Sequence, residues 1–409
     1  MLMPMLQRLY PEDTPAFRRA VSQTVPAGIL AALERVTTRR LPWSWANNSC
    51  HLDTWLMEKL FLLGNLAIVH GPDQVCLEPP CGSLAEKLVC VLLNAGTPAQ
   101  NNWKENYWVQ SLSETEWNYF QKFDFIASHD SRLARKGGGP GADMTDIAYD
   151  RELTCTNVHH ETVSRRTHKV DVLFACGWYP LPDQANRPRN AEGFCTDGPS
   201  KLIPFEDSEA MVESQLGRSS GQLIQCRDCL DESGVHFRKV TKYPASIQWP
   251  IQLNVTCPPA RLQDMTGFKP KLSLDFGSVH YELTSVSYSN VGHFNCTVRR
   301  MNLDDDTGGT WYKYDGMGTG TRRTDGTSNL LCLIDSDHFY KPFKKGYKPC
   351  RLTYVRTRPL TKNLCPVRSI DFPVDRVKGL QFSDMWCILE DASEHAQFDK
   401  NASKSPGTK

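Results

Sequence analysis

The sequence predicts an α+β fold, in which a helical part comes first and a β-rich part follows. Apolar residues recur at helical spacing early in the chain, whereas later segments such as KLSLDFGSVHYELTSVSYS alternate and are rich in β-branched residues. A glycine-rich stretch, SRLARKGGGPGAD, lies between the two patterns and predicts a flexible joint. The elements are therefore grouped by type, which disfavours an alternating βαβ fold.

Length, charge and cysteine content exclude several classes of protein. The chain has 409 residues and a formal net charge of +1, so no global field favours nucleic acid or a membrane as partner. The best apolar run, LFLLGNLAIVH, is too short to span a bilayer. Fifteen irregularly spaced cysteines, an odd number, do not fit a secreted disulfide scaffold. We expect a cytoplasmic or nuclear protein whose cysteines are reduced, catalytic or metal-bound.

The predicted segments follow one another along the chain without internal repeats. We expect the first helical segment to be interrupted at Pro26. The segments, in order, are an N-terminal helical extension (1–39), a helical part (about 40–150), a β-rich part (about 151–335), a basic C-terminal extension (336–391) and a disordered tail (392–409).

The basic extension contains a stretch, residues 341–368, with nine Lys or Arg residues, no Asp or Glu, and interleaved Tyr and Phe. Such a stretch could bind nucleic acid or an acidic partner. We favour the simpler interpretation of a solvated surface that balances acidic regions elsewhere. Nucleic acid is therefore not expected as a partner.

Cys50 stands between the polar turn Asn47-Asn48-Ser49 and an apolar run with helical spacing. A thiol at a helix N-terminus has a lowered pKa and can react as the thiolate. Asn48 is placed to serve as an oxyanion donor together with the Cys50 backbone N–H. The alternative is an inert core cysteine that happens to follow a turn.

His293 and Asp315 are candidate partners for such a thiol. His293 follows the turn Ser289-Asn290-Val291-Gly292 between two alternating strands, where Gly292 permits close approach of another backbone. Asp315 follows a short aromatic strand in GGTWYKYDGMG, a suitable place for a carboxylate that orients an imidazole. The alternatives are a packed core histidine and an ordinary Asp-Gly turn.

Taken together, these motifs resemble the ubiquitin-specific protease family, the papain-like cysteine proteases that remove ubiquitin. The Cys box is NNSCHLDTWLM, and the His box is VGHFNCTVRR followed by TWYKYDG. The resemblance implies a helical thumb at about 40–150 and a β-rich palm with finger strands at about 151–335. It also implies Cys50 as nucleophile, His293 as general base and Asp315 as the orienting acid, while Asn48 matches the family's Asn two residues before the cysteine.

The sequence also departs from the family pattern. Trp45 replaces the Asn that the family carries five residues before the cysteine, Phe294 replaces a Tyr, and Gly316 replaces a second Asp. The segment CHLDTWL is similar to the Cys box of a divergent branch that acts on SUMO. The expected partner is therefore ubiquitin or a SUMO-like modifier conjugated to protein. The alternatives are a SUMO-directed isopeptidase and an inactive ubiquitin-binding scaffold.

A structural zinc site is a further expectation, and no cofactor is expected for catalysis. Cys226 and Cys229 form a CxxC pair, which suits tetrahedral zinc but requires a second pair of ligands. The resemblance implies a zinc ribbon with its first pair near Cys155, where His159 or His160 could replace the missing cysteine. The preferred ligand set is Cys155, His159, Cys226 and Cys229; the alternative is a ribbon held by packing alone.

Overall fold

The structure is a computed structural model in which the chain divides into a unit of residues Met1–Asn363 and a unit of residues Leu364–Lys409. All residues described here belong to the first unit. They are 15–44, 49–71, 84–111, 122, 125–126, 145–155, 163–170, 172–179, 201–204, 211–212, 215–216, 223–225, 237–256, 270–276, 279–290, 292–302, 308–317, 330–339 and 346–357. The predicted tail at 392–409 lies outside them.

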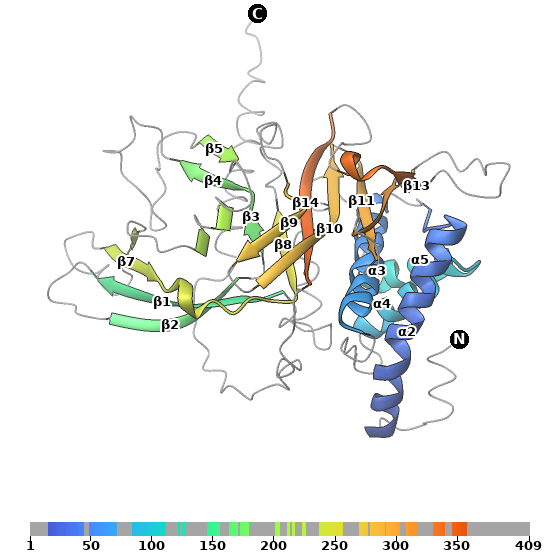
Figure 1. The fold of residues 1–409 in the computed structure, drawn as a ribbon, viewed down its shortest axis with the longest axis horizontal. Coiled ribbons are helices and arrows are strands. Elements are labelled where there is room, and N and C mark those ends of the chain that lie inside the picture. The colour runs from blue at the N-terminus through green and yellow to red at the C-terminus, as the bar shows by residue number, and fades with distance from the viewer. Residues whose placement is uncertain are drawn as a thin grey trace, which may run out of the picture. The chain divides into compact units, whose positions relative to one another are not determined.

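The described helices precede the long strands, so the predicted α+β class is confirmed (Figure 1). The helices are α2 (Pro15–Arg39), α3 (Cys50–His70), α4 (Leu84–Leu93) and α5 (Gln100–Ser111). The strands are β1 (Ile147–Cys155), β2 (Val163–Val170), β3 (Leu173–Phe174), β4 (Cys176–Tyr179), β5 (Lys201–Pro204), β6 (Leu223–Gln225), β7 (Phe237–Lys242), β8 (Gln252–Thr256), β9 (Ser273–Phe276), β10 (Val279–Ser289), β11 (Phe294–Met301), β12 (Gly309–Tyr314), β13 (Leu331–Ile334) and β14 (Lys348–Arg356).

The described strands form three sheets. The largest has the order β13-β12-β11-β10-β14-β8-β3, with β9 paired to β10, and only the β3–β8 pair in it is parallel. A separate antiparallel sheet has the order β2-β1-β7-β6, and β4 pairs with β5. The palm and finger strands were expected at about 151–335, whereas the described sheets begin with β1 at Ile147 and take in β14 at Lys348–Arg356.

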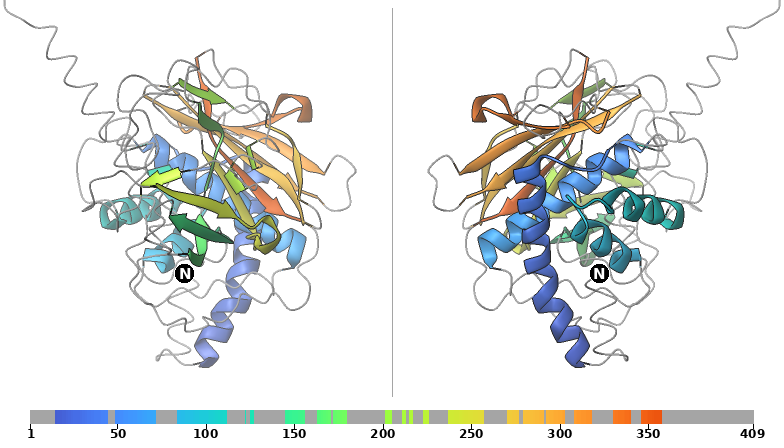
Figure 2. Two further views of the ribbon diagram at one scale, coloured as in Figure 1. Left: turned by 90° about the vertical axis from the view of Figure 1, so that its left-hand side faces the viewer. Right: turned by 90° about the vertical axis from the view of Figure 1, so that its right-hand side faces the viewer.

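Helix α3 packs on β11, β10 and β14 of the large sheet, and Figure 2 shows the helices on one side of its strands. All of residues 50–67 are buried, including the predicted apolar positions such as Leu52, Trp55 and Leu56. The Asn65 side chain binds the helix to β11 through hydrogen bonds of both its amide nitrogen and its amide oxygen. Its Nδ2 donates to the Arg299 carbonyl at 2.7 Å, and its Oδ1 accepts from the Met301 N–H at 2.9 Å.

Two expectations about the chain ends are wrong. Helix α2 continues through Pro26, because buried residues on both sides of the proline, Val25 and Ile29, keep the helix packed on its neighbours. The basic stretch is not simply a solvated surface. Its residues Lys348–Arg356 form β14, which lies between β10 and β8 and buries Leu352 and Tyr354 completely.

Among the described helices, none has both the length and the hydrophobicity needed to cross a membrane.

Replacing Asn65 by Ala should lower the free energy of unfolding by about 2–4 kcal/mol, because a buried carbonyl and a buried N–H of β11 lose their partners. Urea denaturation followed by circular dichroism measures the change. Asn106→Ala, an exposed asparagine on α5, is the matched control and should stay within about 0.5 kcal/mol of the unmodified protein. Equal effects of the two substitutions would contradict this account of the contact between α3 and β11.

Candidate active site

Cys50 is the first residue of α3, as predicted, and its side chain is buried. The N-cap residue Ser49 makes no side-chain hydrogen bond to the amides of the first turn. Its hydroxyl instead donates to Oδ2 of Asp53 at 2.7 Å. Cys50 lies at the positive end of the helix dipole, which favours negative charge that develops on a bound oxyanion there. Asn48, the predicted oxyanion donor, lies outside the described residues.

His293 is positioned by the turn between β10 and β11. Oδ1 of Asn290 accepts hydrogen bonds from the Gly292 N–H at 3.1 Å and from the His293 N–H at 2.9 Å. The Asn290 N–H in turn donates to the His293 carbonyl at 3.1 Å. The expected role of Gly292 is wrong, because no described atom would lie within 4 Å of a Cβ at that position. The Asn290 side chain thus fixes the turn.

Asp315 follows β12 and forms a second turn of the same kind. Its Oδ1 accepts from the Met317 N–H at 3.0 Å, and the same oxygen accepts from Nε2 of His293 at 2.7 Å. The Asp315 backbone N–H donates to the Leu330 carbonyl at 3.0 Å. One carboxylate oxygen thus accepts hydrogen bonds from both the local backbone and the His293 ring.

The electrostatic surroundings of His293 favour its protonated form. Burial lowers the pKa of the ring, but the hydrogen bond to Asp315 and the interaction with the Cys50 side chain raise it to about 9. Nδ1 makes no hydrogen bond of normal geometry to a described residue, so the thiol contact is looser than the Asp315 contact. With Nε2–H donated to Asp315, Nδ1 is the ring nitrogen that can take the thiol proton.

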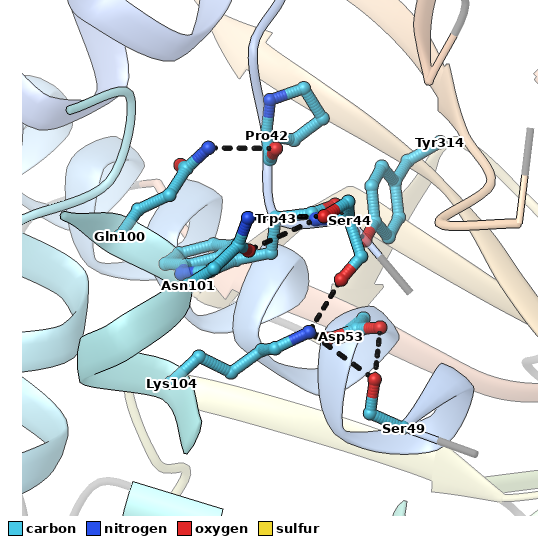
Figure 3. A network of polar contacts seen from close by, with 9 residues as sticks. All are labelled: Pro42, Trp43, Ser44, Ser49, Asp53, Gln100, Asn101, Lys104 and Tyr314. Atoms are coloured by element: carbon cyan, nitrogen blue, oxygen red, sulfur yellow. Dashed lines mark hydrogen bonds and ion pairs between the residues drawn. The ribbon is translucent and has the colours of Figure 1, made fainter. Parts of the chain in front are cut away.

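A buried ion pair lies directly behind the start of α3 (Figure 3). Nζ of Lys104, on α5, is 2.8 Å from Oδ1 of Asp53, and both side chains are almost completely buried. Burial raises the pKa of Asp53 to about 6, although Lys104 and Ser49 oppose the shift and the charge of His293 lowers it further. Asp53 is therefore electrostatically coupled to the histidine of the site.

Residues 42–44, which precede the Cys box, are held by hydrogen bonds from two sides (Figure 3). From α5, Gln100 Nε2 donates to the Pro42 carbonyl at 3.1 Å, and Lys104 Nζ donates to the Ser44 carbonyl at 2.5 Å. From the large sheet, the Tyr314 hydroxyl donates to the Trp43 carbonyl at 2.8 Å. Tyr314 immediately precedes Asp315, so one strand end supports both the carboxylate and this segment.

Aromatic contacts join the two halves of the site. The ring of His51, next to Cys50, lies 5.1 Å from the Trp108 ring and 6.5 Å from the Phe294 ring, measured between centroids. Phe294 is the residue after His293. The Tyr347 ring stands edge-on to His293 at 6.2 Å. The residues that follow the thiol and the imidazole are therefore packed against each other.

The expected zinc ligands are described only in part. Cys155 is the last residue of β1, whereas His159, Cys226 and Cys229 lie outside the described residues. Strands β1 and β6 pair with the two edges of β7, and both run antiparallel to it. Cys155 of β1 and Ile224 of β6 are both paired with Arg238 of β7. β6 therefore ends, directly before Cys226, at the same end of the sheet as Cys155. Within the described part of the chain, no group of three or more His, Cys, Asp or Glu could hold a metal.

Asp53, Lys104 and Tyr314 were not found from the sequence. A lone Asp within the apolar run after Cys50 was the available signal, because a buried carboxylate needs a partner. Its partner comes from another helix, and no local pattern identifies Lys104 among the aromatic residues of 103–108. Tyr314 was seen only as part of an aromatic strand.

Comparison with known proteins gives limited similarity. No family model matches the sequence, and no curated protein matches it. Among solved structures, the Saccharomyces cerevisiae PAN2 pseudoubiquitin-hydrolase is similar with a TM-score of 0.43 and 11% identity, over 76% of this chain and 86% of that one. The Ubp8-Sgf11-Sgf73-Sus1 SAGA DUB module is similar with a TM-score of 0.44 and 10% identity, over 79% and 69% respectively. The function of this chain therefore has to be inferred from the geometry of its own residues.

The pKa of His293 should fall toward its ordinary 6.5 in Asp315→Asn, because the carboxylate that raises it is removed. In the folded protein the ring binds its proton more tightly than in the unfolded chain. The resulting stability is fully present below pH 6.5 and is lost as the pH rises through about 9. Ring-nitrogen NMR between pH 5 and pH 10, roughly the range over which such a histidine titrates, measures the shift. A His293→Gln variant assigns the signal, and an unchanged titration in Asp315→Asn would refute the proposed pairing.

Proposed function

We propose that the protein is a cysteine-dependent isopeptidase that removes ubiquitin or a ubiquitin-like modifier from proteins. The observation that carries this proposal is the arrangement of three side chains. Cys50 begins a helix, His293 interacts with the thiol, and Asp315 binds the far nitrogen of the ring at 2.7 Å. Residue types, chain order and geometry together fit one mechanism, that of a papain-like protease.

In the first half-reaction, Nδ1 of His293 takes the Cys50 proton and Sγ attacks the carbonyl carbon of the modifier's C-terminal glycine. The C–N isopeptide bond then breaks, and the proton passes from His293 to the departing lysine amine. The modifier remains bound to Sγ as a thioester. The high pKa of His293 keeps the proton on the ring until the amine needs it.

In the second half-reaction, His293 takes a proton from water, and the hydroxide attacks the thioester carbonyl. The C–S bond breaks, and the proton returns from His293 to the Cys50 sulfur. Asp315 remains ionised throughout and stabilises the imidazolium formed in each half-reaction.

The oxyanion formed in both steps needs hydrogen-bond donors near Sγ. The Cys50 backbone N–H is one proposed donor, supported by its place at the beginning of α3. Asn48 is the proposed second donor, on the basis of its spacing from Cys50 in the sequence. Trp45 stands where the family that these motifs resemble carries its usual donor, which leaves this role to Asn48 or, as the alternative, to Asn47.

Covalent labelling by modifier probes tests the function. A ubiquitin or SUMO probe with a C-terminal electrophile should label the unmodified protein and fail to label Cys50→Ser. With a fluorogenic modifier substrate, His293→Ala should lower kcat by roughly 10²- to 10⁴-fold. Asn48→Ala should lower kcat by roughly 10²- to 10³-fold without loss of folding.

The labelling pattern also decides among the functional alternatives. Labelling by the ubiquitin probe alone assigns a deubiquitinase, and labelling by the SUMO probe alone assigns a SUMO-directed isopeptidase. Absence of labelling by both probes in folded protein would overturn the enzymatic proposal and leave a modifier-binding scaffold. A cytoplasmic or nuclear setting, where such conjugates occur, is part of the proposal.

A structural zinc in the finger strands is a separate proposal. The common end of β1 and β6 supports it, because Cys155 and the residue before Cys226 are then only two strand spacings apart, roughly 10 Å. Metal analysis of the purified protein should give one zinc per chain, lost in a Cys226→Ser/Cys229→Ser double variant. Less than stoichiometric zinc in the unmodified protein would overturn the proposal.

A further inference from the structure

The Asp53–Lys104 pair raises a question that the catalytic triad does not answer. Neither residue reaches the proposed reacting atoms, yet two opposite charges are buried directly behind Cys50. Burying such a pair is rarely a net source of stability, because desolvation offsets the attraction between the charges. A buried pair of this kind is therefore a candidate for a positional role.

The contacts of Lys104 show what this pair holds. Its ammonium group donates to the Ser44 carbonyl at 2.5 Å and to the Ser49 hydroxyl at 3.2 Å, as Figure 3 shows. Asp53 completes the network, because its Oδ2 accepts from the same Ser49 hydroxyl and its backbone N–H donates to the Ser49 carbonyl at 2.8 Å. The Lys104 ammonium group thus contacts both Ser44 and Ser49, the described residues that flank 45–48.

The position of Ser49 matters for the chemistry. Because the peptide bond is planar, the Ser49 carbonyl and the Cys50 N–H are fixed as one unit. The Ser49 carbonyl is held by the Asp53 N–H, and its side chain is held by Asp53 and Lys104. These contacts therefore determine the direction of the Cys50 N–H, the donor proposed for the oxyanion.

We propose that Asp53 and Lys104 are positioning residues that fix Ser44, Ser49 and the Ser49–Cys50 peptide so that the Cys50 N–H faces the developing oxyanion. The proposal rests on the proposed acyl-transfer function. It separates two properties of the site: the reactivity of the thiol, which depends on His293, and the stabilisation of the oxyanion, which depends on this pair.

Two small reagents measure these properties without any modifier. Alkylation of Cys50 by iodoacetamide requires a reactive thiol but forms no oxyanion, whereas acylation by p-nitrophenyl acetate requires both. Rates measured on Cys50→Ala are subtracted to remove the contribution of the other cysteines. The ratio of the acylation rate to the alkylation rate then reports on the oxyanion donors alone.

The double variant Asp53→Asn/Lys104→Met removes both charges while nearly preserving volume. Its ratio should fall about tenfold or more, because a small displacement of an oxyanion donor is enough for such a loss. The matched control is Glu58→Gln/Arg351→Met. That pair is also buried and lies 3.8 Å apart, with Glu58 on α3 and Arg351 on β14, and its contacts include the Ser287 hydroxyl, the Asn254 side chain and the Ile126 carbonyl. The control should keep its ratio within about twofold.

An unchanged ratio in folded Asp53→Asn/Lys104→Met overturns the proposal, as does an equal fall in the control. Circular dichroism and thermal melting establish folding in each case. If the double variant does not fold, Ser49→Ala replaces it, because it cuts the link between the pair and the Cys50 peptide without leaving a helix cap unmade. An unchanged ratio in Ser49→Ala also overturns the proposal.

The pH dependence of the ratio of acylation rate to alkylation rate in the unmodified protein is a further measurement. A purely structural role of Asp53 and Lys104 would not change it. The groups facing Asp53 are Lys104 and Ser49, and His293 acts on it through its charge, whereas Tyr314 is neutral because burial raises the pKa of its phenol well above the ordinary value. Asp53 gains a proton below its pKa of about 6, which weakens the pair. The ratio should therefore fall below pH 6 in the unmodified protein and stay level in the double variant; a level ratio in both contradicts the proposal.

Failure of the proposed function gives a different result. Unmodified protein that is acylated at Cys50 but hydrolyses neither ubiquitin nor SUMO conjugates fails as an isopeptidase. The ratio test of Asp53 and Lys104 still applies to that protein, because it needs no modifier.

Discussion

The burial of α3 is the constraint on which the rest of the structure depends. A helix enclosed from residue 50 to residue 67 cannot leave a charged or amide side chain to the solvent, so these side chains need partners within the protein. Asp53 finds Lys104 on α5, Glu58 finds Ser287 and Arg351 on the large sheet, and Asn65 binds the backbone of β11. These polar contacts tie the helix to α5 at its first turn and to the large sheet further along, so each one acts on its own part of the helix.

The same constraint brings the proposed catalytic groups together. Cys50 is carried by the buried helix. His293 directly precedes β11 and Asp315 directly follows β12, and both strands belong to the sheet on which the helix lies. Each of the last two is held locally by a side-chain-to-backbone turn, through Asn290 and through Asp315 itself. The distance from Cys50 to His293 and Asp315 is set by the packing of α3 on the large sheet, so the three side chains can adjust it only slightly.

Local sequence patterns predicted those parts of the molecule that local interactions decide. The start of α3 at Cys50, the strands on either side of His293 and the turn at Asp315 all follow from spacing and turn chemistry. β14 could not be predicted in this way, because its Lys and Arg residues suggested a surface. Arg351 is buried among partners that are far from it in the sequence, namely Glu58, the Ile126 carbonyl and Asn254. Lys104 was missed for the same reason: its role depends on a contact between segments that no local pattern relates.

The position of β14 has a consequence for how the protein is made. Contacts between α3 and β11 join residues 234 positions apart, and β14, which completes the centre of the sheet, is synthesised later still. At typical translation rates α3 leaves the ribosome roughly 10 to 50 seconds before the strands that cover it. During that interval a long apolar helix is exposed, which is the condition that chaperones recognise. The proposed active centre is therefore among the last regions of the chain to form, and a nascent chain that ends before residue 348 carries Cys50, His293 and Asp315 on an incomplete sheet.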